Sequence, residues 1–187
     1  GAIKLEGKDI THLSPGQISE AGVGRTPQDR HQGTIGELTV AENLALEHIM
    51  DYTNKGLLDR KKIREDAATI IKEFQIKASP GDQLRKLSGG NMQKVVLARA
   101  LSRKPKVLIA SQPTRGLDVG ATEYVRNRLL DERANGTAVI LLSEDLDEVL
   151  ALSDRIAVIY EGRIMGVVPS AEATPEKIGL LMAGAVQ

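Results

Sequence analysis

The chain has 187 residues with 25 basic and 25 acidic side chains, so its net formal charge is zero and gives no reason to expect a nucleic-acid partner. Aromatic residues make up 2% of the chain, which leaves few surfaces for stacking bases, and the absence of cysteine excludes disulfides and thiolate metal sites. The length allows one domain with a sizeable core, and no apolar run reaches the roughly 18 residues of a membrane helix.

The first 37 residues predict an edge strand, a short helix and a loop. Apolar and polar residues alternate around Gly7, which is typical of a hairpin. Residues 14–22 begin with Ser and Pro and end at Gly22, which favours a short capped helix. Residues 23–37 are rich in glycine and charge and are expected to be mainly loop.

From Leu38 the spacing of apolar residues becomes helical. Thr39 is followed three residues later by Glu42, the pattern of a capping box, and predicts a helix to about residue 50. Asp59 caps a second predicted helix whose apolar residues fall on one stripe. We expect residues 38–86 to form a helical subdomain inserted into a larger core.

The remainder of the chain predicts an α/β sheet. A helix beginning near Gly89 is expected to end before Pro105. Apolar runs then alternate with helical spacing, in the order strand 106–110, helix 119–136, strand 137–143, helix 144–154, a hairpin turning at Glu161–Gly162, and a last helix. Continuous apolar strands separated by helices favour a parallel sheet with helices on its faces.

The segment "LSGGNMQK", Leu87 to Lys94, stands at the head of the predicted helix that begins near Gly89. Consecutive glycines let backbone N–H groups approach an anion, and the helix dipole favours negative charge there. A Ser-Gly-Gly helix start alone is more often an ordinary cap than a phosphate site. The motifs around it decide between the two interpretations.

Those motifs are "VLIASQP", "TRGLD" and "VILLSED", in that order after the segment. Together they resemble the ATP-binding-cassette (ABC) ATPases over about Ala2 to Ala183. The spellings "SGGN-x-QK" and "PTRGLDVGA" are most similar to the second cassette of the duplicated ATPase subunits of bacterial simple-sugar and nucleoside importers. The resemblance implies an α/β, P-loop NTPase-like core with an inserted helical subdomain.

The resemblance also implies roles for particular residues. It identifies the nucleotide-contacting signature as Leu87, Ser88, Gly89, Gly90 and Gln93, the D-loop acid as Asp118 and the Q-loop residue as Gln28. It divides the chain into an N-terminal strand and Q-loop part (1–37), a helical subdomain (38–86), a part with the signature helix, Walker B strand, D-loop and switch (87–168) and a C-terminal helix (169–187).

Several positions depart from the pattern of the ABC ATPases. The chain contains no G-x-x-x-x-G-K-[ST] phosphate loop, which the resemblance places just upstream of Gly1, so the chain looks like a cassette truncated after that motif. The two Walker B acids are replaced by Ser111 and Gln112, and the switch histidine by Glu144. We therefore expect no intact catalytic residue. We also expect no metal site, because the three histidines have no metal-like spacing.

The resemblance implies a subunit or fragment of a sugar or nucleoside importer, on the cytoplasmic face of the membrane. Its partners would be a second cassette, transmembrane permease subunits and, indirectly, a solute-binding protein. ATP and Mg²⁺ would act in the assembled transporter, with the signature and D-loop of this chain completing a site on the other cassette.

The alternatives are a structural or regulatory remnant and a non-transport ABC ATPase. The segment between Gln28 and Leu87 is too short for the coiled coil of one non-transport branch, and the zinc-binding cysteines of another are absent. A sheet truncated in this way would leave one face bare, so self-association, exchange of elements or marginal stability is expected.

Overall fold

A computed structural model describes residues 1–54 and 56–184. At its N-terminus β1 (Lys4–Leu5) and β2 (Lys8–Asp9) form an antiparallel hairpin, as the alternation around Gly7 predicts. Helix α1 (Pro15–Glu20) begins at the capping residue Ser14, whose side chain and that of Gln17 each bond the other's backbone N–H. The predicted short helix is therefore confirmed, with the capping box fixing its start.

Three strands form the central sheet, in the order β3 (Val23–Thr26), β6 (Val107–Ser111) and β7 (Ala138–Leu142). Strands β3 and β6 are parallel, with Val23 opposite Val107 and Thr26 opposite Ala110. The predicted α/β fold with a parallel sheet is confirmed. Residues that precede and follow a helical segment of about 80 residues are thus neighbours in one sheet.

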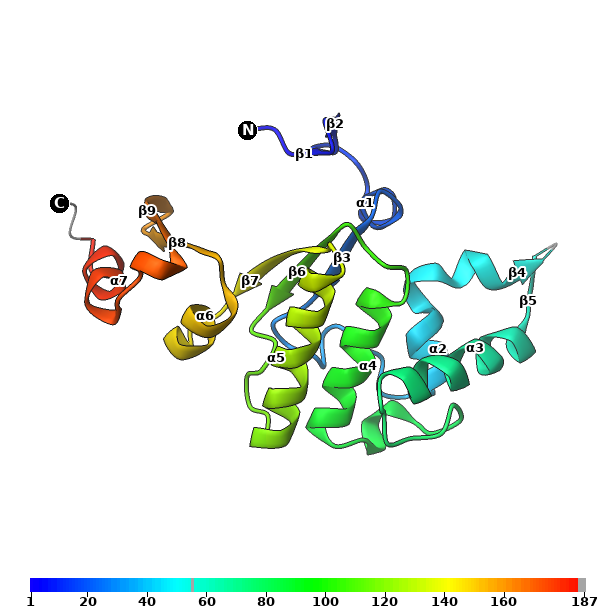
Figure 1. The fold of residues 1–187 in the computed structure, drawn as a ribbon. Coiled ribbons are helices and arrows are strands. Elements are labelled where there is room, and N and C mark those ends of the chain that lie inside the picture. Colours follow the sequence, from blue (N-terminus) through cyan, green and yellow to red (C-terminus); the bar gives the residue numbers. More distant parts are fainter. Residues whose placement is uncertain (55, 185–187) are drawn as a thin grey trace. The chain divides into compact units, whose positions relative to one another are not determined.

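Two long helices pack beside each other on this part of the chain, α4 (Gly89–Leu101) and α5 (Val119–Ala134) (Figure 1). Helix α4 also packs on β3. The helix start at Gly89 and its end before Pro105 agree with the prediction. The central residues of α4 are fully buried, among them Val95, Val96 and Leu97, and side chains of this kind stabilise a fold by roughly 1.5–3 kcal/mol each.

The segment between β3 and α4 is mainly helical, as predicted, but is more broken than its periodicity suggests. Helix α2 (Val40–Ala45) starts at the Thr39–Glu42 capping box and passes into a 3₁₀ segment, η1 (Leu46–Tyr52). His48 has non-helical angles (φ −133°, ψ 26°), so one predicted helix is in fact two pieces. The other elements are β4 (Thr53–Asn54), β5 (Leu57–Leu58), α3 (Arg60–Glu73), which Asp59 caps, and the 3₁₀ turn η2 (Leu84–Lys86).

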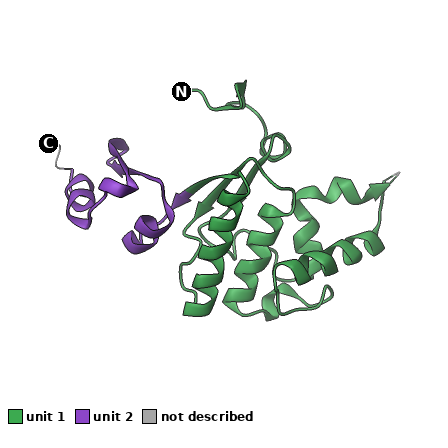
Figure 2. Ribbon diagram, viewed as in Figure 1, with its two compact units in different colours: residues 1–140 green, residues 141–187 purple. Residues whose placement is uncertain are grey.

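The chain divides into two compact units, residues 1–140 and 141–187 (Figure 2). The second contains α6 (Leu146–Leu152), the predicted hairpin of β8 (Arg155–Tyr160) and β9 (Arg163–Pro169), the 3₁₀ turn η3 (Ser170–Glu172) and α7 (Pro175–Met182). Its core is a cluster of Ile156, Val158, Val168 and Ile178. The finer division into four segments stays a prediction.

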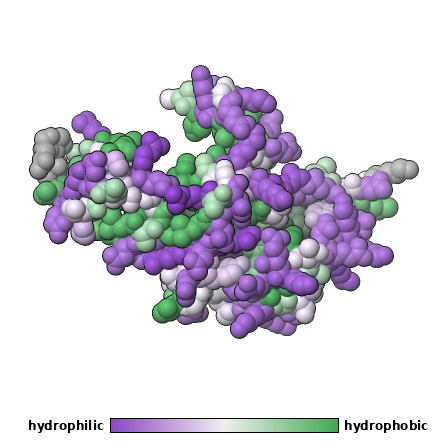
Figure 3. Space-filling view, viewed as in Figure 1, coloured by the Kyte–Doolittle hydropathy of each residue, from purple (hydrophilic) through white to green (hydrophobic). Residues whose placement is uncertain are grey.

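Apolar side chains reach the surface in several places between hydrophilic ones (Figure 3). On β7, Ile140 and Leu142 are 53% and 47% exposed, although strands of a parallel sheet are usually covered on both faces. The partly bare sheet and self-association both stay predictions. None of the helices described in residues 1–54 and 56–184 is both long and apolar enough to cross a membrane.

Candidate functional site

The start of α4 is held by hydrogen bonds to its own side chains and to the chain before it. Ser88 is the N-cap, and its hydroxyl accepts bonds from the backbone N–H of Asn91 and from the Asn91 amide at 3.0 Å. The side-chain Oδ1 of Asn91 in turn accepts from the backbone N–H of Lys77 at 2.8 Å. Asn91 therefore orients the Ser88 hydroxyl and joins the predicted signature to the end of the helical segment.

The start of α5 lies directly against this helix start. Asp118 caps α5 by accepting a hydrogen bond from the N–H of Ala121 at 2.8 Å. A Cβ atom built on Gly90 would lie 3.0 Å from the Ala121 methyl group and 3.9 Å from an Asp118 carboxylate oxygen. A side chain at this position would require Ala121 to shift, so glycine favours this close approach, which brings the predicted signature and the predicted D-loop together in one surface.

Arg30 joins the loop after β3 to both of these segments. Its Nη1 donates to the backbone carbonyl of Arg115 at 3.0 Å. Its guanidinium also lies against Gly89, because a Cβ atom built there would be 3.2 Å from Nη2. The bond between Arg30 and Arg115 could not be predicted from local sequence, since the two residues lie 85 positions apart along the chain.

A second arginine anchors the other end of the same loop. Arg99 of α4 is 5% exposed, donates to the carbonyl of Gly33 at 2.6 Å and forms an ion pair with Glu47 at 3.2 Å. Burial lowers the pKa of Arg99, and the Glu47 carboxylate partly offsets that effect. The loop 27–33 is thus attached to α4 at two points.

The other predicted nucleotide contacts lie in different surroundings. Gln28 is exposed on the loop after β3, and Leu87 is half-buried just before the signature serine. Gln93 is 3% exposed inside α4, so its side chain is part of the packed interior. The structure therefore brings Ser88, Gly89, Gly90 and Asp118 together and leaves Gln28 and Gln93 outside that group as predictions.

The positions expected to carry catalytic acids offer neutral side chains. Ser111 ends β6, and Gln112 follows in a left-handed conformation (φ +46°) that is uncommon for residues other than glycine. Glu144 belongs to the second unit. Among the described residues no group of three or more His, Asp or Glu side chains could hold a metal ion. A serine and an amide do not fit Mg²⁺, which prefers carboxylates, so we assign no step through this metal to the chain's own residues.

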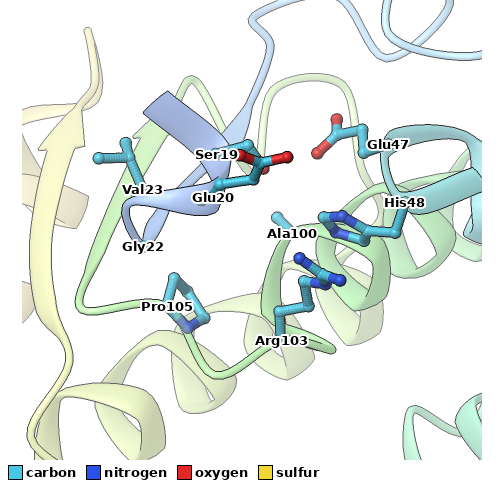
Figure 4. A pocket seen from close by; sticks show the side chains of 10 residues that line it. Ser19, Glu20, Gly22, Val23, Glu47, His48, Ala100, Arg103 and Pro105 are labelled. Carbon is cyan, nitrogen blue, oxygen red and sulfur yellow. The ribbon is translucent and has the colours of Figure 1, made fainter. Parts of the chain in front are cut away.

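A cavity of about 120 Å³ lies at the opposite end of β3 from this site (Figure 4). His48 and Arg103 lie beside each other at its edge, and Glu20 of α1 reaches in from the other side. Arg103 is also paired with Asp51. Burial lowers the pKa of His48, and the charges of Arg103 and Arg99 add to this effect against Glu47. The cavity thus combines opposite charges, of which Arg103 is paired with Asp51 and Glu47 with Arg99.

Several import proteins are similar to this chain in sequence. It is 47% identical to a nucleoside import ATP-binding protein of Lactococcus lactis, over 98% of this chain and 37% of the relative. It is 45% identical to a guanosine import ATP-binding protein of Bacillus subtilis, over 100% of this chain and 38% of the relative, and 40% identical to the ribose import ATP-binding protein of the same species, over 98% and 38%. The chain therefore spans less than two fifths of the length of these relatives.

Solved structures give the same fold. A nucleotide-free ATP-binding cassette from an ABC transporter superposes with a TM-score of 0.76 at 26% identity, covering 98% of this chain and 73% of the other. A dimeric cassette in a post-hydrolysis state, bound to ADP and phosphate, superposes with a TM-score of 0.74 at 23% identity, covering 91% and 73%, and shows the fold alone. The sequence model of the ABC transporter family matches residues 1–115. The chain is therefore a member of the ABC transporter family.

Proposed function

We propose that the chain belongs to the ATP-binding subunit of an importer for a simple sugar or a nucleoside and offers its signature face to ATP held by a second cassette. The observation that carries this proposal is the close approach of Gly90 to Asp118 and of Gly89 to the Arg30 guanidinium, which bonds the Arg115 carbonyl. These elements form one surface at the start of a 13-residue helix, where backbone N–H groups and the helix dipole favour phosphate.

The relatives support the transported class. Three proteins 40–47% identical over 98–100% of this chain are named import ATP-binding proteins for nucleosides, guanosine or ribose. The chain would then act with a partner cassette and permease subunits on the cytoplasmic face of the membrane, and with a solute-binding protein indirectly. ATP and Mg²⁺ would be held mainly by the partner.

The proposal assigns no hydrolysis to the chain's own residues. Gln112 has the shape of a glutamate but cannot accept a proton, and Ser111 supplies no anionic oxygen. What this chain contributes to the reaction is therefore orientation and positive potential at the phosphate, from the amides of Gly89 and Gly90 and the hydroxyl of Ser88.

The test mixes the chain with a second cassette that has its own phosphate loop, acidic pair and switch histidine but whose own signature serine is replaced. Such a cassette cannot complete a site with a copy of itself. We expect ATP hydrolysis to appear only when both are present, together with ATP-dependent association in light scattering. If the mixture shows no hydrolysis and no association, the structural or regulatory remnant is favoured instead.

A further inference from the structure

The geometry points to Arg30 as a positioning residue: we propose that its guanidinium locks the start of α4 to the loop before α5, so that the two present one rigid surface. The inference rests on the proposed function only for its consequence in hydrolysis. Its structural part is a statement about residues within this chain.

The contacts of Arg30 reach both segments at once. Nη1 donates to the carbonyl of Arg115, while Nη2 lies 3.2 Å and Cζ 3.5 Å from the place where a Gly89 Cβ would be. A Cβ atom on Gly116 would be 3.9 Å from Nη2. The planar guanidinium therefore lies across the two glycines, a placement that the single ammonium of a lysine could not reproduce.

The unpaired atom of Arg30 supports a role beyond holding its own loop. Its Nε is buried and has no hydrogen-bond partner within residues 1–54 and 56–184. A buried N–H without a partner is unfavourable, so this arrangement is not explained by the hydrogen bonding of the arginine alone. What the arrangement does supply is a fixed distance between Gly89 and Arg115.

The loop that carries Arg30 is itself firmly placed. The N–H groups of Gln32 and Gly33 donate to the Asp29 carbonyl, and Thr34 donates to the carbonyl of Arg30. At the far end Arg99 holds Gly33. Because α4 supports the loop through Arg99, a movement of the loop 27–33 is transmitted to the signature and to the loop of Arg115 together.

The first experiment follows amide hydrogen exchange in the chain alone, for Arg30→Gln and for the control Arg85→Gln. Arg85 is an exposed arginine whose guanidinium bonds the side chains of Glu37 and Gln83. We expect exchange to rise severalfold in residues 91–94, the first hydrogen-bonded amides of α4, and in residues 114–118 of Arg30→Gln, and to stay unchanged there in Arg85→Gln. Unchanged exchange, or a rise in only one of the two segments, would overturn the lock whatever the protein does.

A second pair of variants guards against a general loss of folding. Gly89→Ala places a methyl group against the guanidinium, so it should raise exchange at residues 114–118 in the parent chain and add little to Arg30→Gln. Additive effects of the two changes would contradict a contact between them. Arg30→Lys keeps the charge and is expected to recover only part of the protection from exchange that Arg30→Gln loses. Full recovery of protection would overturn the need for a planar group.

The third experiment measures hydrolysis with the signature-deficient partner cassette described above. Because Arg30 acts on the shape of the surface, Arg30→Gln should lower kcat about tenfold and leave the KM for ATP within about twofold. If the parent chain gives no stimulation, the proposed function fails, while the exchange data still decide the lock. If the parent stimulates and Arg30→Gln equals it, the role of Arg30 in positioning for hydrolysis is wrong.

Discussion

The start of α4 and the end of β6 are two places where the resemblance to the ABC family predicts nucleotide chemistry. The side chains at the two places differ in kind and in their contacts. At the start of α4, Ser88, Gly90 and Asp118 are joined by caps and close backbone approaches, and Arg30 connects them to a third segment. At the end of β6, Ser111 and Gln112 carry neither an anionic oxygen nor a proton acceptor. The comparison separates a surface that we propose to contact another cassette's phosphate from a position whose side chains cannot break bonds: the first can be retained without the second.

Gly89→Asp is the change expected to have the largest effect on the function proposed for the start of α4. It adds a carboxylate at the helix start that we propose to face phosphate, beside the guanidinium of Arg30, so it should both repel phosphate and compete with the Arg115 carbonyl. We expect stimulated hydrolysis to fall at least about 100-fold, equivalent to about 2.7 kcal/mol. The assay is the mixture with the signature-deficient cassette, with ATPase rate and association followed together.

Gly81→Asp is the matched control for that change. Gly81 is exposed, and a Cβ atom there would meet no atom within 4 Å, so the same charge is added without a contact. Its ATPase rate should stay within about twofold of the parent. If Gly89→Asp leaves both rate and association unchanged, the signature face is not used and the remnant interpretation is correct.

The support beneath the surface is tested by Arg99→Met. The change keeps an apolar stem but leaves Glu47 and the carbonyl of Gly33 without the guanidinium. Because Arg99 is buried, we expect a loss of about 2–4 kcal/mol in the free energy of unfolding, measured in urea by circular dichroism. Arg85→Met, which breaks an exposed pair with Glu37, should cost less than about 1 kcal/mol. Equal losses would show that Arg99 is not a special anchor.

A smaller effect is expected from the pH dependence of His48. Its folded pKa lies below the ordinary value of 6.5, because burial and the nearby charges of Arg103 and Arg99 disfavour the imidazolium. Its contribution to stability is therefore present above the unfolded pKa and is lost as the pH falls through the folded pKa. The free energy of unfolding should decline from about pH 7 to about pH 5, and His48→Gln should reduce that decline. A parallel decline in both proteins would assign it to other groups.

Local patterns predicted most of the fold but not the contacts that make the surface. The capping residues Thr39, Asp59 and Ser88 gave correct helix starts because a cap depends on a few neighbouring atoms. The break at His48 was missed. Glu47 next to it pairs with Arg99 on another helix, and periodicity does not report such contacts.

The same limit applies to the candidate site. The motif spelling predicted Ser88, Gly89, Gly90 and Asp118, which the structure brings together. The bonds of Arg30 to Arg115 and of Arg99 to Gly33 span 85 and 66 residues, so only the folded arrangement reveals them. The burial of Gln93 likewise follows from how α4 packs, because the motif sequence does not tell whether this turn of the helix is exposed or buried.

The smallest effect should come from Gln112→Glu, which restores one missing acid at the end of β6. The side chain keeps its size, and the left-handed backbone at this position already accommodates a residue of that shape. We nevertheless expect ATP hydrolysis by the chain alone to stay within about twofold of background, because a general base accelerates only a reaction whose phosphate is already positioned, and the 187 residues contain no G-x-x-x-x-G-K-[ST] loop to hold it. Calorimetry should show correspondingly weak ATP binding in both the parent and the variant. Micromolar affinity, or hydrolysis that appears with the glutamate, would mean that the end of β6 is a working site lacking one group, and the contrast with the start of α4 would then be one of degree.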